Sequence, residues 1–554
     1  MSHVEKPRPK GGVPIDPQIF WVSLVVLLAF GGTLVVFPDV SLVYLKKALR
    51  FMTHDLGAIF LWFTFGVVIW LAWLAASRFG ARRLGAPDDA PAYSTVSWFG
   101  MLFCAGIGSN LLYFGTMEWM WYYLGPPPGV TAQTPEALAW ASAYSYFHWG
   151  ISAWGLYAAA TVPIAYVLHV KRSNILRMSV ACRGLLGDLV DGPLGKVIDV
   201  LFIFGLVGGV GTSLGVGVPM VSAVAAHIFG VEVGPDLDLV ILVGLTVVFS
   251  ISVSMGLDKG IKRLSDLNVV LAITLLLFVL LVGPTAFIVN QASDGLGLML
   301  QNFVSMSLRT DVAAGSGFAQ DYTVFYWAWW IAWAPFMGLF VARISGGRTI
   351  REVVLGVTLG GSLGCWAGFA VLGNTLMDLM RSGKESVTKL LEVDVPSAVE
   401  GPEAVVQLLD SLPMSGAIFV IFFVLSFIFV ATSLDSAAFT LAATASKDLP
   451  VDGHPPRWHR LMWAFVLGGI AMTLMKLGGL KVLQAASVVV GLPVLFTMGL
   501  AIISVMRWLR GEERTPVPAV ATGPSSSEPA PVDSPAAKSD GPESTAQGDA
   551  STEA

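Results

Sequence analysis

Charge is the property that this sequence has least of. Only 13% of its 554 residues are charged, whereas 55% are hydrophobic, and the mean hydropathy is +0.71. A water-soluble protein of this length could not bury so much apolar surface, so we expect a lipid bilayer to surround the chain. No nucleic-acid partner is expected.

Patterns for catalysis and metal binding are also missing. The three cysteines (Cys104, Cys182 and Cys365) lie far apart, in or beside apolar segments, and form neither a metal-ligand cluster nor a disulfide framework. No Walker loop, zinc-ligand cluster or nucleophile with a companion histidine can be read. His148 in a membrane segment is expected to be a packed neutral residue. We therefore expect neither an enzyme nor a bound cofactor, and Na⁺ only as a candidate coupling ion.

Long apolar segments, in contrast, are plentiful. A helix needs about 20 apolar residues to cross a hydrocarbon core, and twelve runs meet this condition. They are 18–44, 55–77, 93–123, 137–169, 196–229, 236–255, 267–291, 321–344, 349–379, 412–446, 458–477 and 481–507. The first run has no small-residue cleavage site after it, which favours a retained span.

The distribution of basic residues supports twelve spans. With the N-terminus in the cytoplasm, 24 of the 33 lysines and arginines fall on the inner side, as the positive-inside rule predicts. Both ends are then cytoplasmic: a tail at 1–17 and a Pro/Ser-rich, disordered tail at 508–554. Residues 292–311 are too mixed to span and predict an amphipathic helix on the outer surface.

Two aromatic clusters stand out, "YWAWWIAWAPF" (326–336) and "HWGISAWGLY" (148–157). The first carries Trp329, Trp330 and Trp333 at spacings of three and four, which places them on one side of a helix. If both helices face each other, the rings can enclose a quaternary ammonium group. The alternative is an aromatic belt at the membrane surface. Ala334-Pro335 favours irregular backbone that lines a cavity.

Glycines and polar residues interrupt the third span. Gly106 and Gly108 would let the backbone unwind or be approached closely, although glycine is also common in packed membrane helices. Asn110 and Glu118 are polar groups at membrane depth, where they are costly. For Glu118 a structural hydrogen bond and a role in transport both remain open.

Hydroxyl groups interrupt two further spans. Ser213 lies in a glycine-rich run of the fifth span, and Thr432, Ser433 and Asp435 lie in the tenth. Hydroxyl oxygens and freed carbonyls can bind a dehydrated sodium ion. Alternatively, each hydroxyl bonds to a carbonyl of its own helix.

Several stretches together resemble the betaine/choline/carnitine transporter family, which moves substrates with quaternary ammonium groups. They are "DYTVFYWAWWIAWAPFMGLFVARISGGRTIRE" (321–352), "MGLDKGIKRLSDLNVVLAITLLLFVLLVGPT" (255–285), "FHWGISAWGLY" (147–157), "TSLDS" (432–436) and "GTMEW" in the third span. The resemblance implies an all-α membrane protein with twelve transmembrane helices and a LeuT-like fold. Two extra helices (18–92) would precede two inverted five-helix repeats (93–291 and 321–507), with an outer helix and linker at 292–320 between them.

The same resemblance implies a substrate site. Trp329, Trp330 and Trp333 would form the cage for the ammonium group, with Trp149, Trp154 and Tyr157 along the same pathway. Its remaining members would be Gly106, Gly108, Asn110 and Met337. The substrate would be a small cationic or zwitterionic compound such as glycine betaine, carnitine or choline, or a sulfonium analogue.

Coupling is where the sequence departs from the family. Ser213, Phe336 and Thr432 match a first sodium site and Ser433 a second, but Leu206 and Val210 stand where the second site needs hydroxyls. "RLSDLNVVLA" also lacks the arginine of sodium-independent exchangers. Sodium symport, proton symport and exchange stay open, and we favour cation-coupled uptake.

The family also implies a homotrimer in the bacterial cytoplasmic (inner) membrane, with both termini cytoplasmic. A non-transporting sensor or a channel of the same fold is the alternative from another functional class. The acidic C-terminal tail lacks the basic segment of osmotically regulated members, so regulation of that type is not expected.

Overall fold

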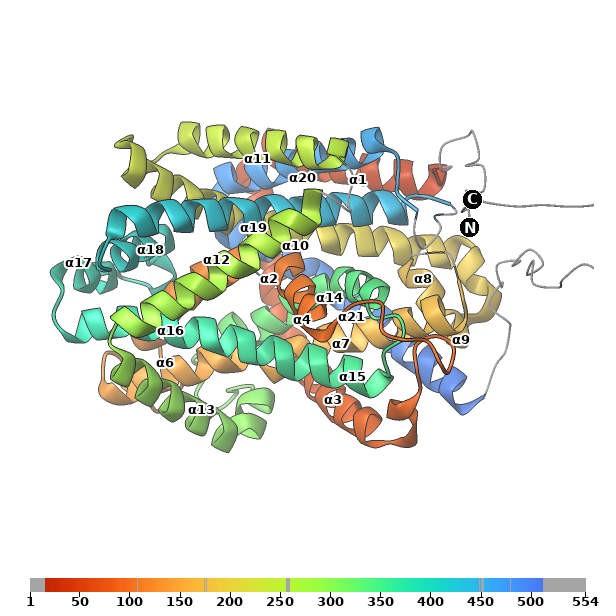
Figure 1. The fold of residues 1–554 in the computed structure, drawn as a ribbon, viewed down its shortest axis with the longest axis horizontal. Helices are drawn as coiled ribbons and strands as arrows, with labels where there is room; N and C mark the ends of the chain where they lie inside the picture. The colour runs from red at the N-terminus through yellow and green to blue at the C-terminus, as the bar shows by residue number, and fades with distance from the viewer. Residues whose placement is uncertain are drawn as a thin grey trace, which may run out of the picture. The chain divides into compact units, whose positions relative to one another are not determined.

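The computed structural model describes residues 15–511 except 107, 174, 176, 256–259, 448, 450–452 and 479. Over these residues the regular elements are helices, and β-structure is limited to two isolated bridges, Ile15–Ser446 and Arg83–Thr349. The all-α class is therefore confirmed, and the helices run side by side over most of their length (Figure 1).

Helices occur at each of the twelve predicted spans. In chain order they are α1 (Pro17–Val36), α3 (Gly57–Ala76), α4 (Thr95–Gly106) with α5 (Gly108–Leu124), α6 (Pro135–His148) with α7 (Ile151–Ala165), α10 (Pro193–Phe229), α11 (Pro235–Met255), α12 (Gly260–Val282), α14 (Phe325–Ile344), α15 (Ile350–Leu355) with α16 (Gly361–Arg381), α19 (Ser415–Thr444), α20 (Arg457–Gly478) and α21 (Leu480–Arg510). Among the described residues, eight helices are long and apolar enough to cross a membrane, or ten when each of two bent pairs is one span. The count of twelve spans and the inverted-repeat arrangement stay predictions.

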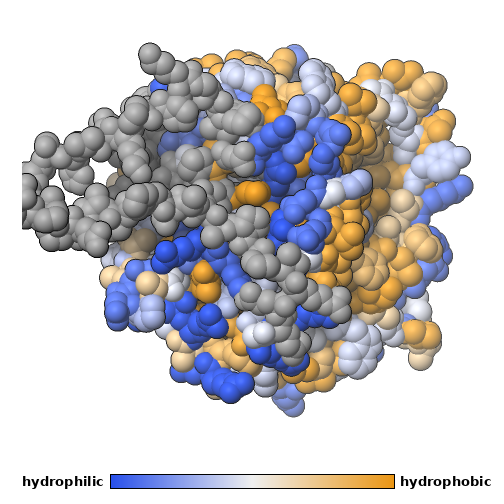
Figure 2. Space-filling model, turned by 90° about the vertical axis from the view of Figure 1, so that its right-hand side faces the viewer, coloured by the Kyte–Doolittle hydropathy of each residue, from blue (hydrophilic) through white to orange (hydrophobic). Residues whose placement is uncertain are grey.

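The surface of these helices is strongly apolar. Each of α3, α11, α12 and α20 has a hydrophobic side chain that is more than 60% exposed. Examples are Trp62, Val240, Leu281 and Phe465. Figure 2 shows such hydrophobic side chains forming a broad surface beside a region of hydrophilic ones. Water would make this exposure costly, whereas lipid chains would not. The chain is a multi-pass membrane protein.

Two predicted boundaries move. The first span ends at Val36, because Phe37 and Pro38 start the separate helix α2 (Pro38–Arg50). The seventh span ends at Val282, since Gly283-Pro284 stops α12 and the chain turns by 107° into α13 (Thr285–Leu308) (Figure 1). The amphipathic helix predicted at 292–311 therefore begins earlier, at a proline that cannot donate a helical hydrogen bond.

Ala334-Pro335 predicted irregular backbone within the eighth span, but the structure has none at this position. α14 continues through Pro335 as one helix, so that expectation is wrong. The fourth span is broken instead, because α6 ends at His148 and α7 begins at Ile151. A Cβ atom on Gly150 would lie 2.5 Å from the carbonyl oxygen of Tyr146, so only glycine fits in this break.

α14 is held among α7, α10 and α21 by small residues. A Cβ atom on Gly338 of α14 would lie 2.9 Å from Ala160 of α7. A Cβ on Gly491 of α21 would lie 2.7 Å from the carbonyl oxygen of Ala328 in α14. Such close backbone approach fixes the rotation of α14 and thereby the direction of its tryptophans.

Shorter helices complete the described chain. They are α8 (Met178–Ala181), α9 (Arg183–Leu186), α17 (Glu385–Thr388), α18 (Gly401–Asp410), the 3₁₀ helices η2 (Arg78–Ala81), η4 (Gly187–Asp191), η7 (Lys389–Leu391) and η8 (Pro396–Ala398), and the π-helical segments η1 (Phe51–Asp55), η3 (Tyr166–Val170), η5 (Ala319–Val324) and η6 (Gly356–Gly360). η5 leads directly into α14. π-Helical turns of this kind are frequent at functional sites.

Candidate functional site

The two aromatic clusters predicted from the sequence do meet. Ring centroids of Trp149 lie 5.3 Å from Trp330 and 5.9 Å from Trp329, and those of Tyr157 and Trp330 lie 4.8 Å apart. Trp154 contacts both Tyr157 (5.6 Å) and Trp330 (6.3 Å). These five side chains, the aromatic cluster below, are at most 3% exposed. An aromatic belt would face lipid headgroups, so the belt interpretation is wrong.

The rings of the aromatic cluster pack directly against one another. Trp149 meets Trp329 and Trp330 edge to face, at interplanar angles of 78° and 79°. A cation bound by a ring must come within about 6 Å of its centroid, and a trimethylammonium group does not fit between rings that already touch. The rings are therefore closed on one another in this structure. The break between α6 and α7, at Trp149-Gly150, lies directly beside them.

Trp333 points to a different neighbour from the other two tryptophans of α14. A Cβ atom on Gly209 of α10 would lie 2.4 Å from Trp333 Nε1, so this indole packs on the α10 backbone. Its centroid lies 5.3 Å from that of Phe336. Met337, predicted to lie by the substrate, is fully buried in the next turn.

The indole N–H groups divide into two sets. Trp149 Nε1 donates to Glu118 Oε2 at 2.7 Å, and Trp154 Nε1 donates to the Cys365 sulfur at 3.4 Å. The N–H groups of Trp329, Trp330 and Trp333 are buried and have no hydrogen-bond partner among the described groups. Each unpaired buried donor costs about 1–3 kcal/mol. α14 thus carries three unpaired donors, of which those of Trp329 and Trp330 belong to the aromatic cluster.

The third span bends in the region of the glycines noted in the sequence. α4 ends at Gly106 and α5 begins at Gly108, with an angle of 66° between Thr95–Phe103 and α5. A Cβ atom on Gly108 would lie 2.0 Å from the ring of Phe429 of α19, so the glycine permits this packing. Asn110 Nδ2 donates to Ser213 Oγ of α10 at 2.8 Å. Its amide therefore links α5 and α10 through one of its two N–H groups.

The residues predicted to bind sodium are buried, and the Oδ1 atom of Asn110, whose amide contacts Ser213, has no hydrogen-bond partner among the described groups. The Thr432 hydroxyl donates to two carbonyls of its own helix, at 2.9 and 3.1 Å, as the alternative interpretation expected. Ser433 is buried at 5% exposure, and Phe336 is fully buried. Leu206 and Val210 are fully buried side chains without oxygen.

Glu118 lies in a hydrogen-bonded chain that the sequence did not reveal. Tyr122 donates its hydroxyl to Glu118 Oε1 at 2.6 Å and lies 2.7 Å from His148 Nδ1. His148 Nε2 in turn lies 3.0 Å from the hydroxyl of Thr323 in η5. Glu118 and Tyr122 are four residues apart on one helix, so the sequence could have predicted their hydrogen bond. Their pairing with α6 and η5 is a tertiary contact.

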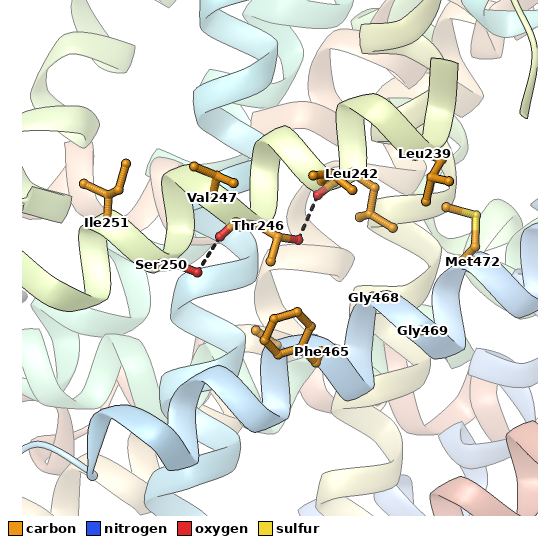
Figure 3. A pocket seen from close by; sticks show the side chains of 12 residues that line it. Leu239, Leu242, Thr246, Val247, Ser250, Ile251, Phe465, Gly468, Gly469 and Met472 are labelled. Carbon is orange, nitrogen blue, oxygen red and sulfur yellow. Dashed lines mark hydrogen bonds between the residues drawn. The ribbon is translucent and has the colours of Figure 1, made fainter. Parts of the chain in front are cut away.

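A hollow of about 740 Å³ lies away from the aromatic cluster. It lies between α11 and α20 and is lined mainly by aliphatic residues and Phe465 (Figure 3). Its two hydroxyls, of Thr246 and Ser250, donate to carbonyls of their own helix at 2.8 and 2.7 Å. Neither a cage of rings nor a free polar group is present there, so it is unsuited to a charged ligand.

Comparison with known proteins identifies relatives along nearly the whole chain. The family model "BCCT, betaine/carnitine/choline family transporter" matches residues 18–514. The glycine betaine transporter OpuD of Bacillus subtilis is 35% identical over 90% of this chain and 95% of its own length. A glycine betaine transporter of Acinetobacter baylyi is 33% identical over 90% of this chain and 74% of its own length. A carnitine transporter of Acinetobacter baumannii is 33% identical over 81% of this chain and 80% of its own length.

Proposed function

Since the chain belongs to the betaine/carnitine/choline transporter family, we propose that it takes up a quaternary ammonium compound by alternating access. The family consists of transporters, so transport, and not catalysis, is the function to test. The substrate class comes from the names of the relatives, and the site comes from the geometry described above.

The observation that carries this proposal is the aromatic cluster. Five buried rings pack together inside the bundle, two from α7, two from α14 and that of Trp149 from the break between α6 and α7. Indole faces attract cations that cannot donate hydrogen bonds, with about 2 kcal/mol or more per desolvated contact. Such a cluster accounts for the recognition of a methylated nitrogen without any carboxylate in direct contact.

The unpaired N–H groups on α14 favour a substrate that also carries a carboxylate. Trp329 and Trp330 lie next to each other, with centroids 6.2 Å apart, and both N–H groups lack an acceptor among the described groups. A carboxylate would satisfy these donors through strong, charge-assisted hydrogen bonds. Glycine betaine and carnitine have this group and choline lacks it, so we place the two zwitterions first.

The remaining features are part of the same proposal. The transporter works as a homotrimer in the inner membrane of a bacterium, with both termini cytoplasmic, and a cation gradient drives uptake. Leu206 and Val210 weigh against sodium as that cation, because they are buried and carry no oxygen where a second sodium site needs hydroxyls. Exchange of substrates is the second candidate mechanism, and a sensor of the same fold is the non-transporting one.

Counterflow in proteoliposomes tests the proposal. Vesicles loaded with unlabelled glycine betaine should take up labelled glycine betaine, carnitine or choline without any ion gradient. Replacement of Trp330 by alanine removes one cation-binding face and should weaken binding about 30-fold, for a contact of about 2 kcal/mol. Trp62→Ala, at a position 64% exposed on α3, is the matched control and should transport normally. A wild-type protein that binds substrate without counterflow would be a sensor.

A further inference from the structure

The chain of hydrogen bonds beside the aromatic cluster has no part in the function proposed so far. Its members, here called the Glu118 relay, are Glu118, Tyr122, His148 and Thr323, and each is at most 2% exposed. They come from α5, α6 and η5 and are joined by distances of 2.6, 2.7 and 3.0 Å. An ionisable side chain held inside a membrane protein is expensive and is usually functional.

No opposite charge compensates Glu118. Among the described residues, no lysine or arginine forms an ion pair with it. Its carboxylate accepts hydrogen bonds from two neutral groups, Tyr122 and Trp149. A buried ionised carboxylate needs a cation beside it, whereas the neutral acid does not. Binding a proton at Glu118 therefore breaks no ion pair.

The other groups around the relay are neutral or peripheral. The titratable side chains that face it are Tyr144 of α6, Tyr322 of η5, Tyr326 of α14 and Cys365 of α16. Charged groups occur only one step further out: Asp321 beside Tyr322, and Arg309 and Asp311 beside Tyr144. The helices α10, α18 and α19 also pack on α5 and bring no titratable group among those that interact with Glu118. None of the groups that face the relay therefore brings a fixed charge to Glu118.

The relay is satisfied in either protonation state. With Glu118 ionised, Tyr122 donates to it, His148 Nδ1–H donates to Tyr122, and Thr323 donates to His148 Nε2. When a proton arrives at His148 Nε2, an N–H bond forms there and the Nδ1–H bond breaks. The Nδ1 proton passes to the Tyr122 oxygen, and the Tyr122 proton passes to Glu118. One proton enters, one proton ends on the carboxyl, and no heavy atom has to move.

We propose that Glu118 carries the proton whose uptake is coupled to uptake of the quaternary ammonium substrate. This inference rests on the proposed transport function and names its coupling ion. The entry end of the relay is Thr323, two residues from the exposed Asp321 at the start of η5. By the predicted topology this end faces the outside, where a proton would be taken up.

Trp149 connects the proton to the substrate. Its indole donates to Glu118 at 2.7 Å, and its ring closes against Trp330 at 5.3 Å. The hydrogen bond to an ionised carboxylate is about twice as strong as one to a neutral acid, so protonation loosens the hold on Trp149. The ring then swings at the Gly150 break and opens the aromatic cluster to the substrate. Proton and substrate consequently bind together, which is the requirement for symport.

The first experiment uses the wild-type protein in proteoliposomes. Counterflow of labelled glycine betaine without ion gradients tests transport itself. A vesicle interior more alkaline than the bath, in sodium-free buffer, should then drive accumulation at least several-fold above equilibrium, and a trapped pH dye should report acidification on substrate addition. Counterflow without a pH-driven component, or accumulation driven only by sodium, would overturn the inference and leave the transport proposal standing. Absence of counterflow would overturn the transport proposal itself.

Variants then assign the proton to Glu118. Glu118→Gln keeps an acceptor for Trp149 but cannot bind the proton, so a pH gradient should no longer raise its accumulation above equilibrium. Tyr122→Phe breaks the relay without removing the acid, so the initial rate should fall while the final pH-driven level is kept. Glu136→Gln, exposed on α6, is the matched control and should behave as wild type. Full pH-driven accumulation in Glu118→Gln would refute the assignment. Equilibrium binding of glycine betaine to each purified variant shows that it is folded.

Discussion

Replacement of Trp330 by phenylalanine tests whether the unpaired N–H groups of α14 bind a carboxylate. Trp330→Phe keeps an aromatic face toward Trp149 and Tyr157 but removes the indole N–H. In the free protein that N–H has no acceptor among the described groups, so its removal strands no partner. Trp149→Phe is different, because it would leave Glu118 Oε2 without its donor.

The effect should depend on the ligand. A hydrogen bond to a charged acceptor contributes about 1.5–3 kcal/mol, so Trp330→Phe should weaken glycine betaine binding by about 10- to 150-fold. Tetramethylammonium has no carboxylate and should lose only the small difference between an indole and a phenyl face. The ratio of the two losses isolates the hydrogen bond, since changes in packing and in cation–π attraction affect both ligands alike.

Isothermal titration of the purified protein with both ligands measures that ratio. Trp154→Phe serves for comparison, because its N–H already donates to Cys365, and both ligands should weaken by the same factor there. The same series at Trp329 and Trp333 shows which donors act. If Trp330→Phe, and both companions, weakened the two ligands equally, the donors would not meet a carboxylate and the preference for a zwitterion would be refuted.

Two further predictions concern stability. Gly108→Ala places a methyl group 2.0 Å from the ring of Phe429, so overpacking of about 1–3 kcal/mol should lower the Tm in detergent; an unchanged Tm would contradict the close packing of α5 on α19. Ser179→Ala removes the hydroxyl that donates to the buried carboxylate of Asp199 at 2.8 Å. Loss of a hydrogen bond to a charged group should destabilise the protein by about 1.5–3 kcal/mol, measured as a lower Tm, whereas Ser382→Ala, at an exposed hydroxyl, should leave it unchanged.

The positions of the helices were readable from the sequence because a bilayer imposes a local rule. A segment that crosses it must be long, apolar and helical, and each condition is visible without knowledge of the neighbours. Gly106 and Gly108 indicated the bend of the third span, because glycine permits irregular backbone whatever its neighbours are. Pro335 misled, because a proline inside a membrane helix can be accommodated by the packing around it, and α14 remains continuous.

The tryptophan spacing predicted a shared helix side, and the sequence by itself could go no further. Whether Trp329 and Trp330 face Trp149 depends on the rotation of α14, which Gly338 and Gly491 fix through contacts with α7 and α21. The same rotation sends Trp333 toward Gly209 of α10, away from its sequence neighbours.

The sequence therefore determined the class of protein, its helices and the residue types of its site, since composition and periodicity carry that information. Only the tertiary structure decided which polar groups form hydrogen bonds with one another. Glu118, His148 and Thr323 are far apart along the chain, and they become neighbours because α5, α6 and η5 pack together. Hydrogen bonds to a buried carboxylate from several helices form only in the assembled bundle, and no single helix can specify them.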